Sequence, residues 1–169
     1  MYKFVLKKVK IYTMPKKYSI PKDDQALNIA SEPAVLFEAS SRRENHLSLS
    51  EKVNVVRAGI SKKDLESLKS KTSMDYTELA RALSVTRATL INKKKNERFG
   101  LSLSEKILDI AELYAYGFEV FEDEESFKRW MDTPNKALNF QKPIDLLDNQ
   151  FGREEVRNII GRIEYGVYS

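Results

Sequence analysis

The sequence predicts an all-α protein that begins with a long extension. Helix-capping residues recur from residue 48 onward, and the apolar residues between them lie three and four positions apart, which is typical of helices. No convincing strand pattern follows residue 12, and no internal repeat is present. A length of 169 residues leaves room for one medium domain or two small ones.

The extension is basic and interrupted by prolines. Residues 1–22 hold seven lysines and no acidic residue, and Tyr2, Phe4 and Leu6 give only a weak strand signal. We interpret this segment as a mobile tail that could contact DNA or a partner. The expected organisation is an extension at 1–46, a helical domain at 47–120 and a second helical domain at 121–169.

Two capping boxes open the helical part. Ser48 with Glu51 precedes a helix that Gly59 should end, and Ser61 with Asp64 opens the next helix. That second helix has an apolar side formed by Ile60, Leu65 and Leu68.

The segment YTELARALSVTRATLINKKKNE has the spacing of a helix-turn-helix. Asp75 with Glu78 starts its first helix, and Ser84 stands at the turn, where glycine is usual. The residues expected to face inward or fill the corner are Leu79, Ala80, Leu83, Val85 and Leu90. A second helix is expected to run through the lysines that follow.

This second helix is a candidate DNA-recognition helix. Residues 51–100 carry twelve Lys or Arg and six Asp or Glu, a net charge of +6, which attracts phosphate. Hydroxyl, amide and guanidinium groups suit base edges. The candidate DNA-binding residues are Thr86, Arg87, Thr89, Asn92, Lys93, Lys94 and Lys95. The alternative is a generic three-helix unit with a solvated basic face.

The last third of the chain is acidic and is also expected to be helical. A long helix should begin at Ser104, Asp123 should cap the next helix, and Pro143 can occupy a first helical position. The final helix has apolar residues at Val156, Ile159, Ile160 and Ile163. The residues expected to pack the core or shape the loops are Trp130, Pro134, Leu138, Pro143, Leu146 and Leu147.

Composition argues against an enzyme, a metal protein or a membrane protein. The chain has no cysteine, one histidine (His46) and no phosphate-cradling glycine loop, so we expect no cofactor and no metal. The acidic run from Glu122 to Glu125 fits a helix start better than an ion site. Without an apolar run long enough for a membrane helix or a secretory signal, we expect a cytoplasmic protein, associated with the nucleoid when bound to DNA.

Residues 121–169 resemble the toxin-binding domain of the Xre/MbcA/ParS antitoxin family, and the segment before them resembles the Xre-type helix-turn-helix. The residues that carry the first resemblance are Phe121, Trp130, Met131, Thr133, Pro134, Asn135, Leu138, Pro143, Asp145, Leu146, Leu147, Gly152, Val156 and the run 161–168. The sequence departs from the family pattern at Asn139, Phe140 and Gln141, where a glycine is usual. The resemblance covers residues 51–169 and implies a small helical toxin-binding domain after an Xre-like bundle.

The resemblance implies a type II antitoxin that is not itself an enzyme. Its usual partner is a RES-domain toxin that degrades NAD, whose active site the antitoxin covers with its chain end. The helix-turn-helix would bind operator DNA for autoregulation, as a homodimer within a larger complex. The residues expected at the toxin are Arg162, Glu164, Tyr165, Gly166, Val167, Tyr168 and Ser169. Two alternatives stay open: a stand-alone transcription regulator, and a chain end that packs on its own helices.

Overall fold

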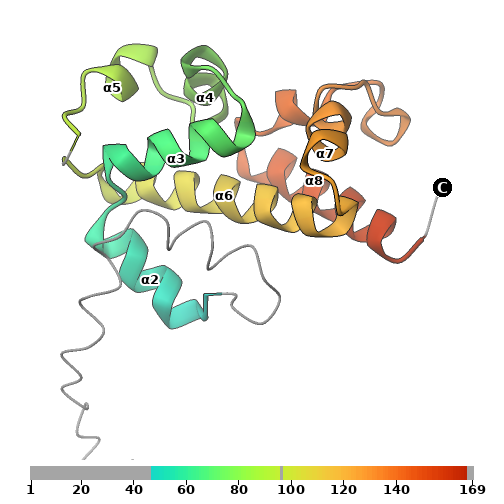
Figure 1. Ribbon diagram of the computed structural model, residues 1–169, viewed down its shortest axis with the longest axis horizontal. Coiled ribbons are helices and arrows are strands. Elements are labelled where there is room, and N and C mark those ends of the chain that lie inside the picture. The colour runs from blue at the N-terminus through green and yellow to red at the C-terminus, as the bar shows by residue number, and fades with distance from the viewer. Residues whose placement is uncertain (1–46, 96, 167–169) are drawn as a thin grey trace, which may run out of the picture.

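The computed structural model describes residues 47–95 and 97–166. These residues form helices joined by loops and turns, without a strand, which confirms the all-α prediction (Figure 1). The elements are α2 (Leu49–Ala58), α3 (Lys62–Thr72), α4 (Tyr76–Ala82), α5 (Arg87–Ile91), α6 (Leu101–Phe121), α7 (Glu124–Met131), η3 (Lys136–Leu138), η4 (Pro143–Leu146) and α8 (Gln150–Glu164). No described helix combines the length and apolar character needed to cross a membrane. The expected extension, including His46, lies outside the described residues.

The predicted caps are confirmed. Ser48 and Ser61 form reciprocal capping boxes with Glu51 and Asp64, and each side chain bonds the backbone N–H of the other. Gly59 ends α2 with φ of +81°, a conformation that residues with a side chain rarely adopt. The capping box predicted for Asp75 and the cap predicted for Asp123 also form, at the starts of α4 and α7. Local side-chain chemistry therefore sets where these helices begin.

The central element is α6, which is buried on several sides. In Figure 1, α3, α4 and α5 lie on one side of α6, α2 lies on the opposite side, and α7 and α8 lie toward its C-terminal end. Ile110 and Leu113 in the middle of α6 have no exposed surface. One continuous apolar core consequently runs from α3 to α8 through this helix.

The predicted start of α6 at Ser104 is wrong, because the helix begins at Leu101. The Ser104 side chain is fully buried and serves a different purpose. Its Oγ accepts a hydrogen bond from the backbone N–H of Ile60 at 2.9 Å and donates to the carbonyl of Phe99 at 3.1 Å. Ser104 therefore joins the α2–α3 junction to the segment before α6 instead of capping a helix.

Two arginines fasten α8 to α6. Both Arg153 and Arg157 donate to the carboxylate of Asp109, the second at 2.6 Å, and Arg153 also donates to the carbonyl of Leu147 at 2.9 Å. Arg153 is buried, and this pairing offsets the cost of removing its charge from water. These contacts set the direction in which α8 leaves the core.

Aromatic rings hold α7 on the C-terminal half of α6. Phe127 is fully buried, and its ring centroid lies 5.3 Å from that of Tyr114 and 5.5 Å from that of Phe118 in edge-to-face geometry. Trp130 stacks on Phe127 at 5.9 Å and is partly buried, as expected for a core residue at the edge. Of the other predicted structural residues, Leu138, Pro143 and Leu147 are buried, Leu146 is half-buried and Pro134 is exposed.

The close approach of α7 to α6 depends on Gly117. A Cβ at this position would lie 2.2 Å from the Phe127 ring, whereas one at Gly161 in α8 would meet only the Tyr116 hydroxyl, at 3.4 Å. We expect Gly117→Ala to lower the free energy of unfolding by about 1–3 kcal/mol because the ring must move. Urea denaturation measures this loss. Gly161→Ala is the control and should be neutral or stabilising through its higher helix propensity.

Candidate nucleic-acid and partner interfaces

The helix-turn-helix is formed by α4, a tight turn and α5. Leu79, Leu83 and Leu90 are fully buried between them, as predicted. Ser84 occupies the turn with φ of +54°, and the next backbone N–H, of Val85, donates to the Ala80 carbonyl at 2.9 Å. Serine at this position therefore adopts the left-handed conformation that glycine usually supplies.

The predicted length of the second helix is wrong. We expected it to run through the lysines, but α5 ends at Ile91 with Asn92 as its C-cap. The chain must turn back here, because the backbone N–H of Phe99 donates to the Ile60 carbonyl at 2.8 Å, beside the α2–α3 junction. The lysines at 93–95 therefore follow the helix instead of lying on its face.

The seven candidate DNA-binding residues nevertheless lie in one continuous segment. Arg87 is exposed in the first turn of α5, with Thr86 as the N-cap. The Thr86 and Thr89 hydroxyls bond each other at 2.8 Å, so one donor is already engaged within the helix. The remaining candidates are exposed except for Lys93, which is half-buried with its Nζ 5.7 Å from the ring centroid of Phe99. An exposed helix start with a guanidinium is what major-groove contact requires.

Lys62, which the sequence did not reveal, positions α5. Its side chain is 7% exposed, and its Nζ donates to the Leu90 carbonyl at 2.7 Å and the Tyr76 hydroxyl at 2.6 Å. It also pairs with Glu66 at 3.0 Å. Burial alone lowers the pKa of Lys62, but the hydrogen bonds that its ammonium donates to Tyr76 and Glu66 outweigh burial and raise the pKa. One charged group thus ties α3 and α4 to the C-terminal turn of α5.

The helix-turn-helix is also bonded to the C-terminal part of the chain. The Ser84 hydroxyl donates to the backbone carbonyl of Asp148, and Arg81 pairs with Asp145 at 2.9 Å. Lys106 of α6 donates to the Leu83 carbonyl at 3.1 Å. The turn between the two helices is therefore tied to η4 and to the residues that precede α8.

The chain end leaves the body of the protein after α8. Tyr165 is 79% exposed, and Gly166 has φ of +66°, so the tyrosine does not pack on the chain's own helices. Arg162 is also exposed. Glu164 differs, because it accepts a hydrogen bond from the Tyr116 hydroxyl of α6 at 2.6 Å. The predicted contacts at Val167, Tyr168 and Ser169 fall outside the described residues.

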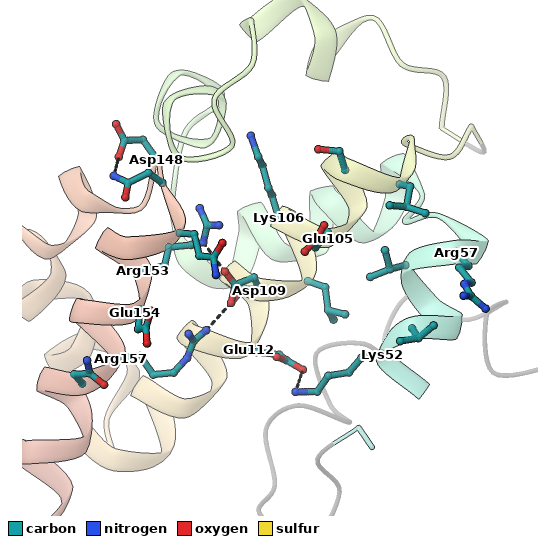
Figure 2. A pocket seen from close by; sticks show the side chains of 18 residues that line it. Lys52, Arg57, Glu105, Lys106, Asp109, Glu112, Asp148, Arg153, Glu154 and Arg157 are labelled. Atoms are coloured by element: carbon teal, nitrogen blue, oxygen red, sulfur yellow. Dashed lines mark hydrogen bonds and ion pairs between the residues drawn. The ribbon is translucent and has the colours of Figure 1, made fainter. Parts of the chain in front are cut away.

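A groove of about 1030 Å³ lies between α2, α6 and α8 (Figure 2). Its walls carry both signs of charge, and several of these charges face each other. Lys52 of α2 pairs with Glu112 of α6 at 2.7 Å, and Asp109 holds the two arginines of α8. No local sequence pattern predicts this groove, since the residues that line it come from three distant segments.

The fold, with Arg87 exposed at the start of α5 and lysines following that helix, is that of a helix-turn-helix DNA-binding protein with a second helical domain. Residues 51–112 match the family model of the antitoxin Xre-like helix-turn-helix domain, and residues 117–166 match that of the antitoxin Xre/MbcA/ParS C-terminal toxin-binding domain. The chain belongs to the Xre/MbcA/ParS family of antitoxins, as the resemblance predicted. Its function is that of a DNA-binding antitoxin of a toxin–antitoxin system, and the family is not generally catalytic.

Two curated relatives agree with this family. An "Antitoxin Xre" of Yersinia enterocolitica is 29% identical over 119 residues, which are 69% of this chain and 80% of the relative. An "Antitoxin Xre" of Photorhabdus laumondii is 30% identical over 73 residues, which are 43% of this chain and 49% of the relative.

Replacing Lys62 should weaken DNA binding even though Lys62 itself is not expected to contact DNA, because it positions α5. Lys62→Met leaves the Leu90 carbonyl without its charged donor, so we expect a loss of about 1–3 kcal/mol in unfolding free energy. We also expect a weaker gel shift with operator DNA, partly rescued by Lys62→Arg.

The pH dependence provides a second test of Lys62. A raised pKa means that this stabilisation is present at neutral pH and is lost as the pH rises through the folded-state pKa, above the ordinary value of 10.5. The stability difference between wild type and Lys62→Met in urea titrations should therefore be constant near pH 7 and shrink at strongly alkaline pH. For the DNA-binding prediction, an operator gel shift that is the same for Lys62→Met and wild type would show that Lys62 does not position α5.

Proposed function

We propose that this protein neutralises a RES-domain toxin that degrades NAD, and that it does so by covering the toxin's active site with its C-terminal end. The observation that carries the proposal is the exposed end of α8. Tyr165 presents most of its surface to solvent at the last turn, within residues that match a toxin-binding domain. An exposed tyrosine supplies a large contact area at a low entropy cost, which suits the centre of an interface.

The geometry around Tyr165 supports an end that projects from the helix. The backbone N–H of Tyr165 donates to the Gly161 carbonyl at 3.1 Å, so the tyrosine is held at the last helical turn. Gly166 then turns the chain out of the helix through its positive φ. We propose that Arg162 and residues 165–169 contact the toxin. Glu164, through its hydrogen bond from the Tyr116 hydroxyl, fixes the helix end that precedes residue 165.

The identity of the toxin rests on the family resemblance. The RES class is the usual partner of this antitoxin family, and an NAD-degrading enzyme is toxic to the cell that makes it. The antitoxin would have to be made with its toxin, which is consistent with a DNA-binding domain on the same chain. We propose that the chain also represses its own operon, as a homodimer within a larger complex with the toxin.

On the DNA side, we propose that Arg87 reads the major groove and that the lysines at 93–95 contact phosphates. The exposed start of α5 is short, so few base contacts are available to one protomer. Two copies on paired half-sites would double these contacts, which is the reason for the homodimer.

The deciding experiment is co-expression with the neighbouring reading frame. If the proposal is right, the neighbour alone lowers cellular NAD, and co-expression of this chain restores both NAD and growth, with the two proteins recovered together by pull-down. If the neighbour neither binds this chain nor harms the cell, the protein is a stand-alone regulator.

Deleting residues 165–169 should abolish neutralisation in that assay. The truncated chain keeps the whole of α8 up to Glu164, so its unfolding midpoint and its operator binding should stay close to those of the wild type. Growth and NAD level are the readouts. Survival of cells that express the truncated chain with the toxin would exclude the covering role of the end.

Replacing Arg87 with Ala should weaken operator binding by about tenfold or more, because a base-contacting arginine contributes about 1–3 kcal/mol. Gel shifts at fixed salt measure the change. Arg129→Ala is the matched control, since it removes the same charge from the exposed surface of α7. Both variants should bind the toxin normally, and equal gel shifts for the two would remove Arg87 from the DNA face.

A further inference from the structure

The loop between η3 and η4 presents an aromatic side chain in an unfavourable backbone conformation. Phe140 is 71% exposed and has φ of +60°, directly after Asn139 with φ of +53°. Asparagine tolerates the left-handed region, but a bulky residue rarely occupies it, because its Cβ crowds the following carbonyl oxygen. A glycine in this loop would adopt this backbone without strain.

Backbone hydrogen bonds hold the loop in this conformation. The Phe140 N–H donates to the Asn135 carbonyl at 2.9 Å, and the Asn135 N–H donates to the Gln141 carbonyl at 3.0 Å, which closes the loop at its base. The Asn135 side chain accepts a further bond from the N–H of Ala137 at 2.9 Å. Leu138, only 4% exposed, anchors the loop in the core. The Phe140 ring is therefore presented from a fixed backbone.

Phe140 gains little from its own fold. With most of its surface in water, the ring contributes little burial energy, while its backbone carries strain. A large apolar side chain that is exposed, strained and fixed in place is typical of a residue kept for contact with another molecule.

We propose that Phe140 is a second anchor for the toxin and that its side chain inserts into an apolar pocket on the toxin surface. This inference rests on the toxin-binding function proposed above. Two observations favour the toxin over DNA or a second copy of the chain. Phe140 lies within the residues 117–166 that match the toxin-binding domain. In Figure 1, the loop after α7 and the end of α8 both lie at the end of the molecule away from α5.

Two anchors on separate segments would fix the orientation of the toxin. Contact through one segment alone allows the bound toxin to rotate about that segment, whereas an aromatic residue on a hydrogen-bonded loop adds a second fixed point. Phe140 would contribute mainly to the lifetime of the complex, and the chain end would occlude the active site.

The test uses substitutions that relieve the backbone strain while removing the ring. Phe140→Gly and Phe140→Asn both suit a positive φ, so the unfolding midpoint of the full chain should stay the same or rise. The Kd for the purified toxin encoded by the neighbouring reading frame should increase about thirtyfold, chiefly through faster dissociation, as expected for an interface hot spot. Surface plasmon resonance measures both quantities, and Phe140→Tyr should retain most of the affinity.

Leu49→Ala is the control, because it removes an equally exposed apolar side chain from α2, outside the matched toxin-binding domain, and it should leave the Kd unchanged. The inference is overturned if both strain-relieving variants bind the toxin with the wild-type Kd. It is also overturned if they lower the unfolding midpoint, since Phe140 would then be a structural residue. Failure of the wild-type chain to bind the toxin would instead refute the proposed function.

Discussion

The structure depends on the burial of α6 from several directions. A helix that is covered by neighbours on more than one side must be apolar around most of its circumference, and this helix meets that requirement with Ile110, Leu113 and Tyr114. The helix-turn-helix packs on its first part, and α7 and α8 pack toward its end. The single core that results leaves no flexible linker between the two matched domains, since residues 113–116 lie inside α6.

Polar contacts then orient the elements that the core has brought together. Asp109 sets α8 through two arginines, and Lys62 sets the last turn of α5 through its carbonyl. These charges are paired, and Lys62 and Arg153 are buried, so each acts in one fixed geometry. Because the core and these contacts hold most of each helix in place, the segments left exposed for binding are short. They are the first turn of α5 and the last turn of α8.

The sequence predicted the features that depend on neighbouring residues. A capping box needs only two side chains three positions apart, so the starts of α2, α3 and α4 could be identified from the letters. The helix start expected at Ser104 had no such pair of side chains behind it. The Ser104 hydroxyl bonds the backbone N–H of Ile60, 44 residues away, and the helix starts earlier, at Leu101. The early end of α5 likewise depends on a bond between Phe99 and Ile60, which no local pattern encodes.

The candidate site residues also divide into those whose positions a local pattern predicts and those whose positions depend on distant contacts. The exposed position of Arg87 at the start of α5 could be predicted, because the spacing of a helix-turn-helix indicates which positions face outward. Lys62 could not, because a lysine on a helix is ordinarily in solvent, and only the folded chain shows it buried beneath α5. In the sequence, Phe140 stood out only because the family pattern has a glycine in this loop. Its backbone strain appears only in the φ angle of the structure.

The shared helix has a consequence for how long the protein survives in the cell. Because both matched domains pack on α6, we expect them to unfold as one cooperative unit. A protease that cleaves the unfolded chain then acts on a state in which the DNA-binding and toxin-binding surfaces have been lost together. Proteolysis that follows unfolding of the core would therefore end DNA binding and toxin binding together. The lifetimes of the two activities are coupled by the fold.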